Sequence, residues 1–117
     1  MQHIAIMKKS WKLINKILSG KKKIESRWYV SKRAPWDRIR DGETIFFKDS
    51  GEPVSLKAEV EKVLQFENLN PEKVKEILDE YGGEGKICVR DLEESCKSNK
   101  NKNYCMLIFL KNARAIE

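Results

Sequence analysis

The segment Gly20–Arg27 carries the residues of this chain best suited to chemistry. It reads Gly-Lys-Lys-Lys-Ile-Glu-Ser-Arg and places Lys22, Glu25 and Arg27 within six residues. In an extended strand, Glu25 and Arg27 point to one face, close enough for an ion pair that fixes the guanidinium. A fixed guanidinium offers a planar fork of donors to a phosphate or a base edge. We therefore predict a nucleotide-binding site here, to which Lys21 and Lys22 add mobile positive charge.

Other segments supply further candidate contacts. Ser50 and Gly51 follow Lys48 in a loop rich in turn residues, where backbone N–H groups and a hydroxyl can reach the same ligand. Trp36 lies in a basic, loop-like context and is the candidate for stacking on a base. Trp28 instead shares a strand face with apolar residues, so we expect it in the core.

Each candidate also has an ordinary structural explanation. Glu25 and Arg27 can form a surface ion pair worth about 0–1 kcal/mol. Lys22 can be a solvated lysine, and residues 48–51 can be hairpin chemistry alone. His3 has no orienting partner near it in the sequence, which favours a structural role over a catalytic one.

Charge is distributed unevenly along the chain. Residues 1–40 carry twelve Lys and Arg against two Asp and Glu, a net charge of +10. Residues 41–94 carry a net charge of −8, and residues 95–117 a net charge of +4. The basic first third also holds all three tryptophans, a combination suited to a polyanion with stackable bases. A solvated basic surface is the alternative explanation of the same charge.

Length and composition bound the class of protein. With 117 residues, 40% hydrophobic and 36% charged, residues 1–117 are expected to form a single folded domain with a densely charged surface. Apolar runs are too short to span a membrane, and the N-terminus lacks a signal-peptide layout, so we expect a cytoplasmic protein. The Lys- and Glu-rich composition with two Gln also indicates a thermophilic source.

Cysteine and histidine usage leaves little room for a metal site. The chain has Cys88, Cys96 and Cys105 without C-x-x-C spacing, and one histidine. We expect no metal and no cofactor. Free thiols are the ordinary expectation inside a cell, although a bridge between Cys96 and Cys105 stays open in a thermophile.

Hydrophobic periodicity predicts the first elements of the fold. Residues 3–7 read as a strand, and residues 10–18 as a helix with Ser10 as its cap and Gly20 beyond its end. Residues 23–30 alternate as a second strand, with Lys23, Glu25, Arg27 and Tyr29 on one face. A short helical turn over 34–39 and a third strand over 44–48 follow.

The second half predicts a long strand, two helices and a buried strand. Residues 54–66 alternate but slip by one residue near Lys62, which indicates a bulge. Asn70 and Pro71 open a helix that runs to Tyr81. A short helix over 91–96 and a polar loop over 98–103 precede the continuous apolar run 104–110. The order of elements predicts a mixed α+β fold with a curved or closed sheet.

The Gly20–Arg27 segment resembles the G-x-K-x-x-E-x-R signature of the ASCH family, matched at Gly20, Lys22, Glu25 and Arg27. The flanking segments are similar too: a helix ending in Ile-Leu-Ser-Gly precedes the signature, and the run 41–48 and Arg114 follow it. On this likeness, which spans nearly the whole chain, it is identified as a small stand-alone ASCH protein. That resemblance implies a PUA-like β-barrel of about five to six strands, flanked by two or three helices.

The resemblance also implies RNA or nucleotide binding as the usual role, by analogy of fold. An alternative is a hydrolase, since some ASCH-like proteins cleave N4-acetylcytidine and others resemble ribonucleases. In the amidohydrolase-like relatives the signature Lys, here Lys22, is paired with a Thr, but this chain has Glu25 where that Thr is expected. A third alternative is a protein-interaction module that uses the acidic segment 57–94.

Overall fold

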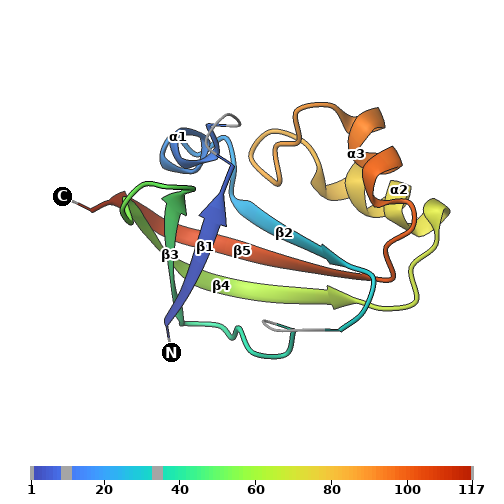
Figure 1. Cartoon of the computed structure of the whole chain (residues 1–117), viewed down its shortest axis with the longest axis horizontal. Coiled ribbons are helices and arrows are strands. Elements are labelled where there is room, and N and C mark those ends of the chain that lie inside the picture. Colours follow the sequence, from blue (N-terminus) through green and yellow to red (C-terminus); the bar gives the residue numbers. More distant parts are fainter. Residues whose placement is uncertain (1, 9–11, 33–35, 117) are drawn as a thin grey trace.

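The structure, a computed structural model, describes residues 2–8, 12–32 and 36–116. This part of the chain contains eight helices and strands. The strands form one sheet, and the helices lie beside it (Figure 1). In chain order the elements are β1 (Gln2–Met7), α1 (Leu13–Leu18), β2 (Ile24–Tyr29), β3 (Thr44–Asp49), β4 (Leu56–Phe66), α2 (Pro71–Tyr81), α3 (Leu92–Asn99) and β5 (Tyr104–Ala115).

The sheet is mixed and has the strand order β1-β3-β4-β5-β2. β1 and β3 run parallel, while the other three neighbouring pairs are antiparallel. The sheet curls into a half-barrel that does not close, because β1 and β2 occupy its two ends without pairing to each other. The predicted PUA-like α+β fold, with five strands and three helices, is confirmed, except that the barrel stays open.

Bulges explain how two long strands curve so strongly. The pairing of β4 with β5 shifts register between Lys57 and Glu59 and again between Val60 and Lys62. An extra residue in one strand bends it and increases its twist. The shift at Lys62 was predicted from the alternation, whereas the shift before Glu59 leaves the side-chain pattern of the sequence unbroken and was missed.

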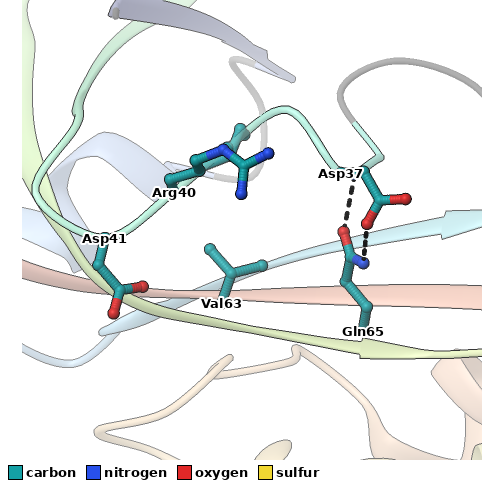
Figure 2. A pocket seen from close by; sticks show the side chains of 6 residues that line it. Asp37, Arg40, Asp41, Val63 and Gln65 are labelled. Atoms are coloured by element: carbon teal, nitrogen blue, oxygen red, sulfur yellow. Dashed lines mark hydrogen bonds between the residues drawn. The ribbon is translucent and has the colours of Figure 1, made fainter.

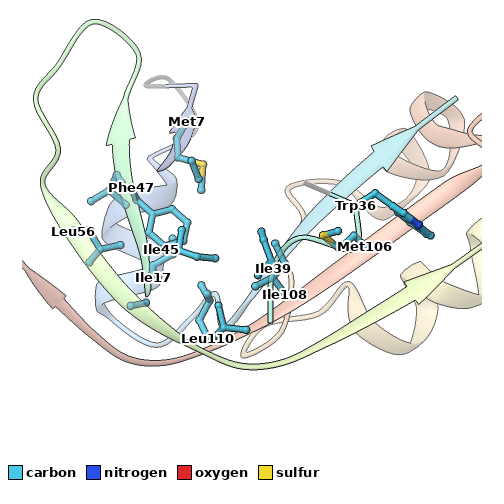
Figure 3. Packing of buried hydrophobic residues seen from close by; sticks show 14 of the residues in the cluster. Met7, Ile17, Trp36, Ile39, Ile45, Phe47, Leu56, Met106, Ile108 and Leu110 are labelled. Carbon is cyan, nitrogen blue, oxygen red and sulfur yellow. The ribbon is translucent and has the colours of Figure 1, made fainter. Parts of the chain in front are cut away.

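Two apolar clusters pack against opposite faces of this sheet. We call the concave side, which carries Phe47, Met106 and Ile108, the inner face (Figure 3). The opposite side, the outer face, carries Ile24, Cys105 and Leu107 over β2 and β5, where α2 and α3 cover it. β5 is therefore buried on both sides, as the unbroken apolar run 104–110 predicted.

Local signals set most helix ends. Asn70 caps α2 by accepting a hydrogen bond from the Lys73 N–H at 2.8 Å, and Asp91 caps α3 in the same way through the Glu94 N–H. α3 runs to Asn99, so the predicted loop from residue 98 was placed too early. The predicted cap Ser10 and the predicted turn start at Pro35 lie outside the described residues.

Two further features are the state of the cysteines and the length and polarity of the helices. All three cysteines are free, so Cys96 and Cys105 are not bridged. Burial raises the pKa of the Cys105 thiol far above its ordinary value. In the described part of the chain, every helix is too short or too polar to cross a membrane.

Candidate functional site

Lys22 lies at the start of the site and is almost completely buried. Gly20, with φ +82°, ends the turn after α1, and the Lys22 N–H then donates to the Lys16 carbonyl at 3.0 Å. The side chain enters the protein interior and is 3% exposed. Its Nζ donates to the carbonyl oxygens of Ile24 at 2.7 Å and Ile87 at 3.0 Å. The expectation that Lys22 adds mobile charge is therefore wrong, and so is the alternative of a solvated lysine.

Glu25 balances the charge of this buried lysine. Its carboxylate is part of a side chain 8% exposed, and Oε1 lies 3.5 Å from Lys22 Nζ. With this contact, three oxygen atoms lie within 3.5 Å of Lys22 Nζ: two carbonyl oxygens and one carboxylate oxygen. Burial lowers the pKa of Lys22, and the charge of Glu25 opposes that shift. The geometry, with three acceptors around one nitrogen, is that of a lysine held as an ammonium ion.

Arg27 extends the pair toward solvent. Its Nη2 lies 3.3 Å from Glu25 Oε2, and its side chain is 33% exposed. Lys22, Glu25 and Arg27 thus form a chain of alternating charge, which we call the signature triad. The triad carries one net positive charge, and the guanidinium at its outer end is held in place through a buried carboxylate.

Strand pairing places Glu25 and Arg27 on the inner face. Glu25 lies opposite Ile108, and Arg27 opposite Met106, both of which belong to the inner apolar cluster. Tyr29, on the same face, lies opposite Tyr104. The predicted alternation of β2 is confirmed, since Ile24 and the half-buried Trp28 pack on the outer side with α2.

Trp36 is a core residue. It is 8% exposed, and its ring packs edge-to-face against Tyr104 at a centroid distance of 5.3 Å. Although Trp36 was the candidate for base stacking, residues 36–39 fold onto the inner face and bury Trp36 and Ile39 there (Figure 3). Trp36 has little exposed ring on which a base could stack.

The other predicted contacts do not gather around Arg27. Lys21 is exposed at the start of the site, where its carbonyl accepts from the Gly85 N–H. Lys48 follows the buried Phe47 and so points to the outer face, away from the triad. Ser50 and Gly51 lie in the exposed turn after β3, where the Ser50 N–H donates to the Met7 carbonyl at 2.9 Å. The structure therefore splits the predicted site between two faces of the sheet.

A pocket of about 430 Å³ also opens on the inner face. Figure 2 shows the loop that carries Asp37 and Arg40 opposite Val63 and Gln65 of β4. Gln65 fixes this loop, because it accepts from the Asp37 N–H at 2.9 Å and donates to the Asp37 carboxylate at 2.7 Å. This pocket could not be predicted from the sequence, since nothing in the spacing shows that the loop folds back over β4.

Comparisons with known proteins agree on the fold. No known family model matches the chain, and no curated protein sequence does. The crystal structure of the hypothetical protein PH0355 matches with a TM-score of 0.66 and 24% identity, over 99% of this chain and 100% of that one. The ASCH protein of Zymomonas mobilis matches with a TM-score of 0.67 and 17% identity, over 97% of this chain and 69% of that one. A mutant of it reaches a TM-score of 0.71 at 15% identity, over 100% of this chain and 74% of that one.

This chain has an ASCH-like fold. The likeness to the Zymomonas mobilis structures extends over almost the whole chain, so it includes the signature segment as well as the half-barrel. Within this ASCH-like fold, the two middle residues of the signature, Lys22 and Glu25, are buried. Arg27 is the signature side chain that reaches solvent.

His3 and Glu43 form a second polar pair in the ASCH-like half-barrel. His3 Nε2 lies 3.1 Å from Glu43 Oε1, which also accepts from the Arg40 N–H at 2.7 Å. His3 thus has a partner 40 residues away that the sequence did not reveal. These two hydrogen bonds lower the pKa of Glu43 from 4.5 to about 2, and the one with His3 has the larger effect.

The low pKa of Glu43 predicts a specific loss of stability in acid. A carboxyl with a folded pKa below its unfolded pKa stabilises the protein above about pH 4.5, and that contribution disappears as the pH falls toward 2. We expect Glu43→Gln to flatten the dependence of the unfolding free energy on pH in this window. Urea denaturation at several pH values measures it, with Glu84→Gln as an exposed control. Equal pH slopes for Glu43→Gln and the unsubstituted protein would contradict the assignment.

Proposed function

We propose that this chain binds RNA through the inner face of the half-barrel, with Arg27 contacting a phosphate or a base edge. Lys22 and Glu25 act as positioning residues, because they hold Arg27 without reaching solvent themselves. The observation that carries the proposal is the 3.3 Å contact between Arg27 and the buried Glu25 carboxylate, itself 3.5 Å from Lys22 Nζ. A guanidinium fixed in this way loses little side-chain freedom when it grips an anion.

The surrounding charge supports an anionic ligand. Residues 1–40, which include β2 and the signature triad, carry a net charge of +10. Lys21 and Lys23 are exposed on either side of Lys22, and Arg40 lies at the rim of the 430 Å³ pocket on the same face as Arg27. A pocket of this size is within the range of small-ligand sites and suits a single nucleoside unit. Lysines and arginines near a groove also release counterions when they meet phosphates.

The hydrolase alternative needs Lys22 as an uncharged amine that reaches a substrate. The lowered pKa of Lys22 is in line with that role. Its position is not, because Nζ donates to two carbonyl oxygens and faces Glu25, and the side chain is 3% exposed. We therefore assign Lys22 to positioning and Arg27 to ligand contact.

Arg27→Ala is expected to weaken RNA binding by about tenfold and to reduce the slope of log K against log salt by about 1, as loss of one phosphate contact does. Fluorescence anisotropy with a labelled single-stranded RNA at several salt concentrations measures both. Arg27→Lys keeps the charge but loses the planar fork of donors, so its RNA affinity should fall between that of the unsubstituted protein and that of Arg27→Ala.

Arg90→Ala is the matched control, since it removes the same charge from an exposed position between α2 and α3. Equal losses of affinity in Arg27→Ala and Arg90→Ala would mean that RNA is attracted by the overall positive charge and that Arg27 is not part of a specific site. Incubation of the same samples with N4-acetylcytidine and with RNA tests the hydrolase alternative. If the protein releases cytidine or cuts RNA and Lys22→Arg does not, the chain is a hydrolase and the RNA-binding proposal is wrong.

A further inference from the structure

The loop that forms the pocket beside Gln65 is pinned to β4 at both ends. At one end, Gln65 holds Asp37 by accepting from its N–H at 2.9 Å and donating to its carboxylate at 2.7 Å. At the other end, the Gly42 N–H donates to the Val60 carbonyl at 2.8 Å, and the Val60 N–H donates to the Glu43 carbonyl at 2.8 Å. A pocket wall held in this way is preorganised, so little ordering is required when a ligand enters.

A tight turn sets the positions of Arg40 and Asp41 on this wall. The Glu43 N–H donates to the Arg40 carbonyl at 3.2 Å, and Gly42, at the third position of the turn, has φ +84°. This is the geometry of a type II turn, whose third position requires a positive φ and therefore favours glycine. The turn leaves both Arg40 and Asp41 in the lining of the pocket, together with Val63 (Figure 2).

Arg40 and Asp41 bring two unpaired charged groups to the pocket. The Asp37 carboxylate already accepts from Gln65, whereas the part of the chain that the structure describes holds no hydrogen-bond or ion-pair partner for the Arg40 guanidinium or the Asp41 carboxylate. Figure 2 shows the guanidinium over Val63 and the Asp41 carboxylate at the end of the pocket away from Gln65. A guanidinium has only donors, and an ionised carboxylate has only acceptors. A ligand that satisfies both groups must present acceptors on one edge and donors on another.

The charge of the pocket favours a base over a phosphate. Its lining contains the carboxylates of Asp37 and Asp41 and one guanidinium, which give a net charge of −1. This charge repels a phosphate, whereas a neutral base can pack its flat face against the apolar side chains of Ile39 and Val63. The pocket therefore suits the uncharged part of a nucleotide.

We propose that this pocket binds the base of a guanosine in RNA, an inference that rests on the RNA-binding function proposed above. Guanine has two neighbouring acceptors, O6 and N7, which match the guanidinium fork of Arg40. Its N1–H and N2 amino groups are neighbouring donors, which match the two oxygens of the Asp41 carboxylate. Arg40 and Asp41 are thus specificity-determining residues, and Arg27 contacts a phosphate of the same strand.

The other three bases satisfy only part of this arrangement. Adenine and cytosine each carry one amino group, so the Asp41 carboxylate finds a single donor group on either base. Uracil has one N–H between two carbonyl oxygens, and these oxygens repel a carboxylate. Of the four bases, guanine alone combines two neighbouring donor groups with two neighbouring acceptors.

The experiment measures the anisotropy of a short fluorescein-labelled oligouridine, and of strands in which one internal uridine is replaced by guanosine, adenosine or cytidine. The guanosine strand should bind about tenfold more tightly than the other three, which is within the discrimination of one bidentate contact. Asp41→Asn and Arg40→Ala should each remove most of this preference. Glu84→Gln and Arg90→Ala are the matched controls, because they remove the same charges from exposed positions outside the pocket and should keep the preference.

Two modified guanosines test each contact without a change in the protein. Inosine lacks the N2 amino group, so the inosine strand should bind the unsubstituted protein more weakly than the guanosine strand does. Asp41→Asn should bind these two strands with nearly equal affinity, because the contact to N2 is already weakened. 7-Deazaguanosine lacks the N7 acceptor, and its loss of affinity should disappear in Arg40→Ala for the same reason.

Equal affinity for all four strands, or a preference for another base, would overturn the assignment of the pocket. A guanosine preference that both Asp41→Asn and Arg40→Ala retain would also overturn it, because the base is then read elsewhere. Arg27→Ala separates the two proposals, since it should weaken all strands by the same factor and leave the guanosine preference intact. If the four strands bind equally but Arg27→Ala still weakens them, RNA binding stands and the guanosine pocket is wrong. If no strand binds, both proposals are wrong.

Discussion

Lys22→Met is expected to destabilise the protein by about 3–5 kcal/mol, the usual cost of removing one partner of a buried ion pair. The substitution leaves the Glu25 carboxylate buried with Arg27 alone, and it removes the donor to the carbonyl oxygens of Ile24 and Ile87. Methionine has a similar length, so lost packing adds little. Urea denaturation followed by circular dichroism measures the change as a shift in midpoint at constant slope.

Two further variants separate the buried pair from the loss of a lysine as such. Lys75→Met removes a largely exposed lysine of α2 that pairs with Asp79, and it should change stability by about 0–1 kcal/mol. The double variant Lys22→Met with Glu25→Leu should be more stable than Lys22→Met alone, because no uncompensated charge remains buried. If Lys22→Met is as stable as Lys75→Met, Lys22 is not the buried ammonium described above.

This result bears directly on function. A lysine whose removal strongly destabilises the protein is a structural part of the signature, whereas removal of a catalytic lysine usually costs activity more than stability. In the structure the signature side chains differ in exposure, with Lys22 at 3% and Glu25 at 8% against 33% for Arg27. We infer that the spacing of the signature links the buried Lys22 through Glu25 to Arg27 by ion pairs, and so holds one exposed guanidinium in place.

The sequence predicted that Glu25 and Arg27 meet, but not how deeply Lys22 and Glu25 are buried. Glu25 and Arg27 share a strand face because alternate residues of a strand always do, and that prediction is confirmed. The burial of Lys22 depends on residues 86 and 87, whose backbone folds back against the start of β2, with the Lys23 N–H donating to the Lys86 carbonyl at 2.8 Å. That contact joins segments more than 60 residues apart, and no local pattern reports it.

The same limit explains the split of the predicted site. Lys48 was grouped with Arg27 because it precedes the Ser50–Gly51 turn, which was expected to reach the same ligand, yet alternation around the buried Phe47 sends Lys48 to the outer face. Knowing which face of β3 is buried would have separated them. Helix ends and the bulge at Lys62 were easier to predict, because Asn70, Pro71 and the slip in alternation are local signals.

Trp36→Ala is expected to destabilise the protein by about 3–5 kcal/mol, as other buried aromatic truncations do. Trp36 is 8% exposed within the inner cluster, and its loss leaves a cavity next to Ile39 and Met106. The edge-to-face contact with Tyr104 at 5.3 Å adds about 0.5–1.5 kcal/mol beyond the buried area. Urea denaturation again measures the change, and Trp28→Ala, at a half-buried tryptophan on the other face, is the comparison.

Trp36→Leu then distinguishes a core residue from a base-stacking residue. Leucine retains much of the apolar contact but cannot stack, and loss of one stacked base costs about 1–3 kcal/mol of binding, or roughly 5- to 150-fold in affinity. Since the ring is enclosed by the inner cluster, we expect the RNA affinity of folded Trp36→Leu to match that of the unsubstituted protein, while its stability falls. A large drop in the RNA affinity of a fully folded Trp36→Leu variant would mean that the loop carrying Trp36 opens when RNA binds. Arg27 and Trp36 would then contact the ligand together, and the site would extend across β5 toward the pocket at Gln65.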